Sequence, residues 1–124
     1  MGIEMGDLSK NFSRSEFKCK CGECEQVGPD PKLIPILQDV RDHFGKPVTV
    51  HSGHRCRAYN ESVGGVEFSQ HPLGTAGDFT VAGVSPRKVQ DYLLSKYPDT
   101  LGIGRYRGFT HVDVREGKGR WDKR

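Results

Sequence analysis

Two short stretches of the sequence each combine a histidine with an aspartate. The stretch SQHPLGTAGDF contains His71 and Asp78, and the stretch FTHVDV contains His111 and Asp113. Two imidazoles and one carboxylate, with a fourth position left to water, are typical of catalytic zinc sites. The two glycines between His71 and Asp78 let the backbone approach a bound ion closely. We therefore predict that His71, Asp78 and His111 bind one zinc ion. Taken singly, each residue also has a structural explanation, as a turn-forming aspartate or a packed histidine.

The hydrophobic pattern predicts the elements that hold these residues. Apolar residues at helical spacing predict one helix within residues 31–45, and Ser85 followed by Pro86 predicts the start of a second helix. Alternating β-branched residues predict strands at 46–52 and 77–83, and LGIGRY followed by FTHVDV predicts an antiparallel hairpin. This order predicts an α+β fold, a small antiparallel sheet with flanking helices.

Length, composition and charge indicate a single domain over residues 1–124, with 1–12 as a lead-in and 117–124 as a solvated tail. The net charge of +3 arises from 19 basic and 16 acidic residues. The basic residues cluster only in the tail, which argues against a nucleic-acid partner. No apolar run is long enough to cross a membrane, and the N-terminus lacks the apolar core of a secretory signal. We therefore expect a monomer with no membrane or nucleic-acid partner.

Four cysteines, Cys19, Cys21, Cys24 and Cys56, have a spacing that matches no standard zinc finger. Without a secretory signal, disulfides are not the default. A pair of disulfides, a second zinc site and four reduced thiols all remain alternatives.

Both histidine-aspartate stretches resemble motifs of the zinc D-Ala-D-Ala metallopeptidases of the M15 type, the peptidoglycan peptidases of bacteria and phages. SQHPLGTAGD has the form S-x-H-x4-A-x-D, and GIGRYRGFTHVDVR has the Gly-Tyr…His-x-Asp form. NFSRSEFKC, SGHRC, VGG and the closing RW also look like that family, in the same order. The resemblance spans about residues 11–122, nearly the whole chain.

The resemblance implies that His71, Asp78 and His111 are zinc ligands, and that the fold is shared with the signalling domain of hedgehog proteins. It also implies that Arg55 binds a substrate carboxylate, for which a planar guanidinium is well suited. Ser69 is a second candidate for substrate binding, with capping of the turn as the equal alternative. The less favoured alternative to Arg55 is the neighbouring arginine of SGHRCR, Arg57.

One position departs from the family pattern. Several relatives carry an acidic general base three residues before the last zinc histidine, where this chain has Gly108. Asp113 is therefore our candidate for the catalytic base. The alternatives are that Asp113 only supports a zinc histidine, or that catalysis is impaired. His51 and His54 lie near Arg55 in the sequence, and no catalytic role is assigned to them here.

The sequence thus predicts a zinc peptidase that cleaves peptide bonds in peptidoglycan stem peptides or cross-bridges. Whether it is a carboxypeptidase or an endopeptidase is left open. The alternative, favoured by Gly108, is a non-catalytic zinc-binding module of a phage particle or a wall-docking protein. A phage or prophage enzyme needs no signal peptide, so we expect a protein that is cytoplasmic as synthesised and acts on the cell wall after release.

Overall fold

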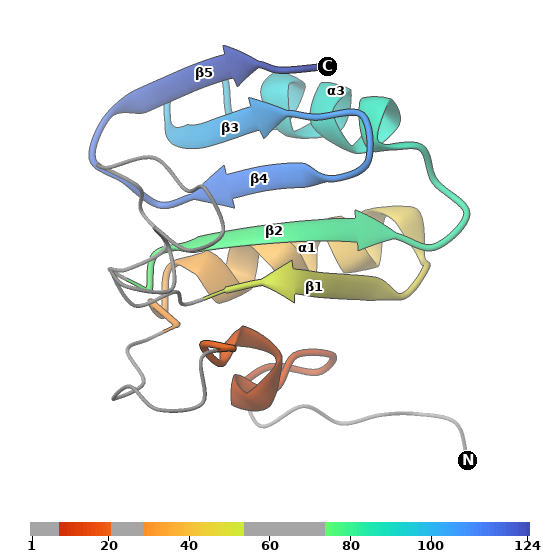
Figure 1. Ribbon diagram of the computed structural model, residues 1–124, viewed down its shortest axis with the longest axis vertical. Coiled ribbons are helices and arrows are strands. Elements are labelled where there is room, and N and C mark those ends of the chain that lie inside the picture. The colour runs from red at the N-terminus through yellow and green to blue at the C-terminus, as the bar shows by residue number, and fades with distance from the viewer. Residues whose placement is uncertain (1–7, 21–28, 54–73) are drawn as a thin grey trace.

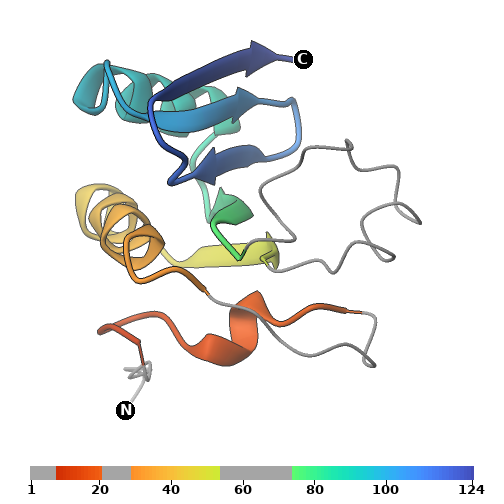
Figure 2. The ribbon, with the colours of Figure 1, turned by 90° about the vertical axis from the view of Figure 1, so that its left-hand side faces the viewer.

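The computed structural model describes residues 8–20, 29–53 and 74–124. Within these ranges the chain forms one short 3₁₀ helix, two α-helices and five strands. In chain order they are η1 (Arg14–Phe17), α1 (Leu33–Phe44), β1 (Val48–Ser52), β2 (Ala76–Val81), α3 (Pro86–Lys96), β3 (Leu101–Arg105), β4 (Thr110–Asp113) and β5 (Lys118–Asp122). Both α-helices lie against the same face of the sheet, and this α+β class is as predicted (Figures 1 and 2).

The five strands form one mixed sheet in the order β1-β2-β4-β3-β5. The predicted hairpin of β3 and β4 is present, and β2 pairs antiparallel with both β1 and β4. However, β5 pairs parallel with β3, so the prediction of an antiparallel sheet is wrong at this edge. Both sides of β4 are occupied by β2 and β3. The chain reverses at Gly117, whose φ is 79°, so β5 runs opposite to β4 and joins the open edge of β3, where it is parallel.

The segment 117–124, predicted as a solvated tail, contains this edge strand. The guanidinium of Arg120 donates to the carbonyl oxygens of Leu101 and Tyr97, each at 2.7 Å. A basic side chain therefore satisfies backbone acceptors at the start of β3. The basic composition of the segment suggested exposure to solvent, but Arg120 is used in this structural role.

The two α-helices begin and end close to the predicted positions. In α1, Gly45 adopts a left-handed conformation with φ 64° and ends the helix, as glycine commonly does. In α3, Ser85 Oγ accepts a hydrogen bond from the Lys88 N–H, and Pro86 is the first helical residue. None of the described helices is long and apolar enough to cross a membrane.

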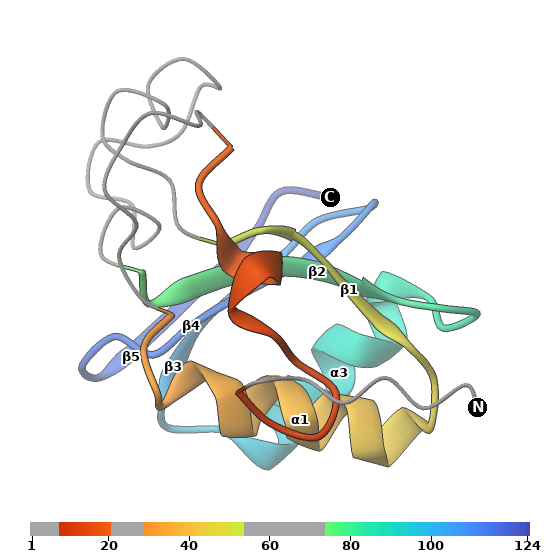
Figure 3. The ribbon, with the colours of Figure 1, turned by 90° about the horizontal axis from the view of Figure 1, so that it is seen from below.

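The hydrophobic core lies between the α-helices and the sheet. Its fully buried side chains are Phe12, Phe17, Leu33, Leu37, Val40, Phe79, Val89, Leu93, Ile103 and Val112. Figure 3 shows η1 against β1, at the edge of the sheet. There Gly53 packs so tightly on Phe17 that a β-carbon would lie 2.6 Å from the Phe17 Cα. The core thus covers one face of the sheet, and the other face is available for the candidate site.

A cluster of hydrogen-bonded polar side chains joins the two α-helices. The carboxylate of Asp39 on α1 accepts hydrogen bonds from the hydroxyls of Tyr92 and Tyr97, both at 2.7 Å, and pairs with Lys96 at 2.8 Å. Burial raises the pKa of Asp39, but these three partners outweigh burial and hold it below its ordinary value. Asp39 is therefore ionised at neutral pH and fixes α1 against the C-terminal end of α3.

Candidate metal centre

Asp78 and His111 face each other on neighbouring strands. They are register partners in the antiparallel pair of β2 and β4. Their side chains meet on the sheet face opposite the α-helices, with Asp78 Oδ1 2.8 Å from His111 Nδ1. Both side chains are largely buried, with exposed fractions of 14% and 8%. Two of the three predicted ligands are thus brought together by strand pairing alone.

The second nitrogen of His111 contacts another carboxylate. His111 Nε2 lies 2.7 Å from Asp113 Oδ2, because residues two apart on a strand share a face. Asp113 has no exposed surface. Its Oδ1 accepts from Arg115 Nε at 2.7 Å, and its Oδ2 accepts from Arg115 Nη2 at 2.8 Å. Both oxygens of Asp113 are therefore engaged, in a chain that runs from Arg115 through Asp113 to His111.

The charges along this series of hydrogen bonds stabilise one another. Burial lowers the pKa of His111, but the hydrogen bonds with Asp113 and Asp78 outweigh it, and the pKa is raised above its usual value. Burial raises the pKa of Asp113, whereas Arg115 and His111 lower it by more, so the net shift is downward. Asp113 is consequently a carboxylate at neutral pH, and it favours positive charge at His111.

The donor set fits a divalent cation. A neutral imidazole carries one N–H, yet each nitrogen of His111 lies against a carboxylate oxygen. If Nε2 donates to Asp113, the Nδ1 lone pair would face the Asp78 carboxylate, which is unfavourable without a positive charge between them. A second proton on the imidazole would supply that charge, and so would a metal ion held by Nδ1 and Oδ1. A carboxylate on the second nitrogen is also the usual partner of a metal-binding histidine.

Two glycines of β3 make room for this arrangement. Gly102 is the register partner of Asp113, and a β-carbon at Gly102 would overlap with the Asp113 carboxylate. Gly104 is the register partner of His111, and a β-carbon there would lie 2.5 Å from Trp121 Nε1. Their role was not recognised from the sequence, although the G-x-G spacing in LGIGRY places both glycines on one face of the strand.

Trp121 on β5 completes the surroundings of His111, with ring centroids 4.9 Å apart. Its indole N–H donates to the hydroxyl of Tyr106 at 2.9 Å, and the guanidinium of Arg115 lies 5.2 Å from its ring. The indole therefore packs on both His111 and Arg115 and limits where either can move. In the sequence, Trp121 contributes only to the family resemblance, and no local pattern predicts this contact.

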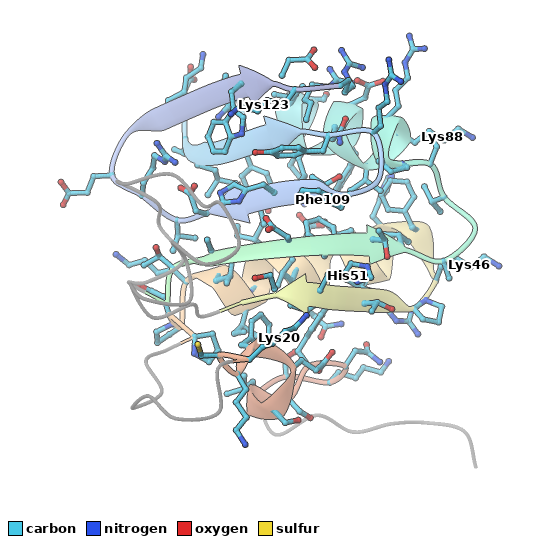
Figure 4. The ribbon with its side chains drawn as sticks, in the orientation of Figure 1. Lys20, Lys46, His51, Lys88, Phe109 and Lys123 are labelled. Carbon is cyan, nitrogen blue, oxygen red and sulfur yellow. The ribbon has the colours of Figure 1, made fainter. Side chains whose placement is uncertain are left out.

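A surface hollow of about 290 Å³ lies beside Asp78. It is lined by His51, Ser52, Asp78, Gly108 and Phe109. Figure 4 shows His51 on the open face of the sheet. The turn that carries Gly108 is held in place from the helix side, because Gln90 Nε2 donates to the carbonyl of Phe109 at 3.1 Å. The candidate site thus has a defined recess next to Asp78 and His111.

The remaining predicted site residues, His71, Arg55 and Ser69, lie outside the described residues. Within the described ranges no group of three or more histidine, cysteine, aspartate or glutamate side chains is placed to hold a metal ion. Of the four cysteines, Cys19 is buried and the other three lie outside these ranges. The third ligand and the state of the cysteines therefore stay predictions.

Comparison with protein families matches residues 10–113 to the family described as Peptidase M15. The chain belongs to the peptidase M15 family. The matched range includes Asp78, His111 and Asp113, and it ends at Asp113. In this M15 peptidase, Arg115 and Trp121 therefore lie just beyond the range that defines the family match. No curated protein matches the chain.

Proposed function

We propose that the chain is a zinc-dependent peptidase that hydrolyses peptide bonds in peptidoglycan stem peptides or cross-bridges. The observation that carries the proposal is the contact of Asp78 with His111, backed by Asp113 and placed beside a hollow. Membership of the M15 family supports peptide hydrolysis. The family resemblance of the sequence supports peptidoglycan as the substrate, the hedgehog-like topology, and action on the cell wall after release from a host cell.

The proposed ligands are Asp78 and His111, together with His71. When bound, zinc supplies a Lewis acid that polarises the scissile carbonyl and makes water more acidic. The described residues contribute by holding the proposed ligands in a fixed orientation. Register pairing holds Asp78 opposite His111, and the tilted indole ring of Trp121 packs against the imidazole and restricts it. Water and substrate reach the site from the hollow side, because the core fills the opposite face of the sheet.

Asp113 is better suited to orienting His111 than to moving protons. A general base must present a free oxygen to the reacting water, but Asp113 is fully buried and both its oxygens are bonded to His111 and Arg115. The geometry therefore supports the alternative in which Asp113 holds a zinc histidine in place. Arg55 and Ser69 remain the proposed residues for binding the substrate carboxylate and backbone.

Digestion of purified peptidoglycan, followed by mass analysis of the products, tests the function. We expect cleavage by the zinc-loaded protein and its loss after treatment with a chelator. Asp78→Ala and His111→Ala should lose bound zinc as well as activity. Asp42→Ala, an exposed carboxylate on the helix side, is the matched control and should keep both.

The product masses also distinguish the two activities. Loss of a terminal alanine indicates a carboxypeptidase, whereas cleavage within the stem or cross-bridge indicates an endopeptidase. If the wild-type protein binds one equivalent of zinc and cleaves no peptidoglycan peptide, the function is that of a non-catalytic zinc-binding module instead.

A further inference from the structure

His51 occupies an irregular position in β1. Pairing with β2 passes from Val50 opposite Phe79 to Ser52 opposite Asp78, so His51 is the additional residue of a β-bulge. A bulge re-aims side chains and is frequent next to active sites. Its effect here is that two consecutive side chains, His51 and Ser52, both border the hollow beside Asp78.

The lining of the hollow leaves few groups that can carry a proton. Among the described residues that line it, only His51 and Asp78 have ionisable side chains. Asp78 is directed at His111 as a proposed metal ligand. Gly108 contributes no side chain, and Phe109 contributes an apolar wall that stacks on Tyr106 with centroids 4.3 Å apart. His51 is therefore the remaining proton acceptor that these five residues offer.

A hydrogen bond on the sheet orients the imidazole of His51. Its Nε2 lies 2.8 Å from Thr80 Oγ1, on the strand that carries Asp78. In the tautomer with the proton on Nε2, the ring donates to Thr80, and the lone pair of Nδ1 is available as an acceptor. The backbone is held as well, because Lys20 Nζ donates to the carbonyl oxygen of His51. The side chain is exposed, so water and substrate can reach it.

We propose that His51 is a catalytic residue of this peptidase, the group that transfers the proton during hydrolysis. The inference rests on the proposed function. Nδ1 of His51 accepts a proton from the attacking water as the water oxygen bonds to the scissile carbonyl carbon. The same proton passes to the leaving nitrogen as the carbon–nitrogen bond breaks. One water is consumed, and the products are a carboxylic acid and an amine.

The tautomer of His51 tests the inference without any measurement of activity. Long-range proton–nitrogen NMR spectra of the zinc-loaded protein, recorded in mildly alkaline buffer, distinguish the two neutral forms of the imidazole. The signal of His51 is assigned by its absence in His51→Gln. We expect the proton on Nε2. A proton on Nδ1 overturns the proposal, because the ring nitrogen left as acceptor would then be bonded to Thr80.

Kinetics on a cleaved stem peptide provide the second test. We expect His51→Ala and His51→Gln to keep bound zinc and the wild-type melting temperature, while kcat falls by about 10²–10⁴. Added imidazole should restore part of the rate of His51→Ala. Thr49→Ala, an exposed residue on the same strand, is the control. It should retain the wild-type rate and show no acceleration by imidazole.

The outcomes distinguish the proposed role of His51 from the proposed peptidase function. If the wild type cleaves peptides and both His51 variants cleave within about threefold of it, the role of His51 is overturned and the peptidase function stands. Loss of zinc from both variants also overturns the role, since His51 would then support the metal site. If the zinc-loaded wild type cleaves no peptide, the proposed function fails and the role of His51 fails with it.

Discussion

The carboxylate of Asp113 lies over the α-carbon of Gly102, its partner in the neighbouring strand. A β-carbon at Gly102 would overlap with all three atoms of the carboxyl group. Because Gly102 has no side chain, Asp113 can lie flat on the sheet while it contacts both His111 and Arg115. The position of the carboxylate that contacts the proposed metal ligand His111 thus depends on a glycine one strand away.

We expect Gly102→Ala to displace Asp113 and weaken zinc binding. Loss of a carboxylate behind a metal-binding histidine typically lowers metal affinity about 10–100-fold. Competition with a chromophoric chelator measures the affinity. Gly108→Ala is the matched control, because a β-carbon there has no neighbour within 4 Å. Equal zinc affinity in the two variants would contradict the role of Gly102.

Asp113→Asn separates an orienting role from a catalytic one. If Asp113 orients His111, zinc affinity should fall about 10–100-fold and excess zinc should restore the rate of cleavage. If Asp113 were the general base, zinc would stay bound and kcat would fall about 10²–10⁴-fold at every zinc concentration. We expect the first result. Zinc titrations of the rate, together with the zinc content of the purified variant, provide the measurement.

Gly108→Glu should introduce a carboxylate at the hollow without harming the fold. A side chain at this position meets open space, and the residue is exposed. We expect the free energy of unfolding to change by no more than about 0.5 kcal/mol. In a protein that also carries His51→Ala, the new carboxylate should raise kcat, because it borders the same hollow. Gly108→Gln has nearly the same size without the charge and should give no increase.

Asp39→Asn should lower stability at neutral pH. Loss of the charged acceptor for Tyr92, Tyr97 and Lys96 is expected to reduce the free energy of unfolding by about 1–3 kcal/mol. The folded state lowers the pKa of Asp39, so its contribution is present above the unfolded pKa of about 3.9. It is lost as the pH falls through the folded pKa.

Urea unfolding of the wild type and of Asp39→Asn, measured between pH 7 and pH 3, checks this dependence. The difference between the two proteins should shrink toward the acid end. Asp42→Asn, on the exposed side of α1, should differ little from the wild type at either pH. A difference between Asp39→Asn and the wild type that does not change with pH would show that the charge of Asp39 is not responsible.

Local patterns in the sequence were sufficient for most elements. Helical spacing with Gly45, and Ser85 before Pro86, marked the two helices, because caps and apolar periodicity act within a few residues. The spacing of two between His111 and Asp113 correctly placed both on one face of a strand. The roles of His71 and Arg55 rest on the sequence resemblance and stay predictions.

Tertiary structure alone decided what surrounds these residues. The parallel edge strand β5 follows from the occupied sides of β4, and no local pattern in 117–124 encodes it. Gly102 beside Asp113, and Trp121 beside His111, are contacts between strands whose register is set by the whole sheet. Sequence therefore determined which chemical groups are present and which face of a strand they share. Pairing of distant strands determined their distances, because hydrogen bonds across a sheet join residues that are far apart in the chain.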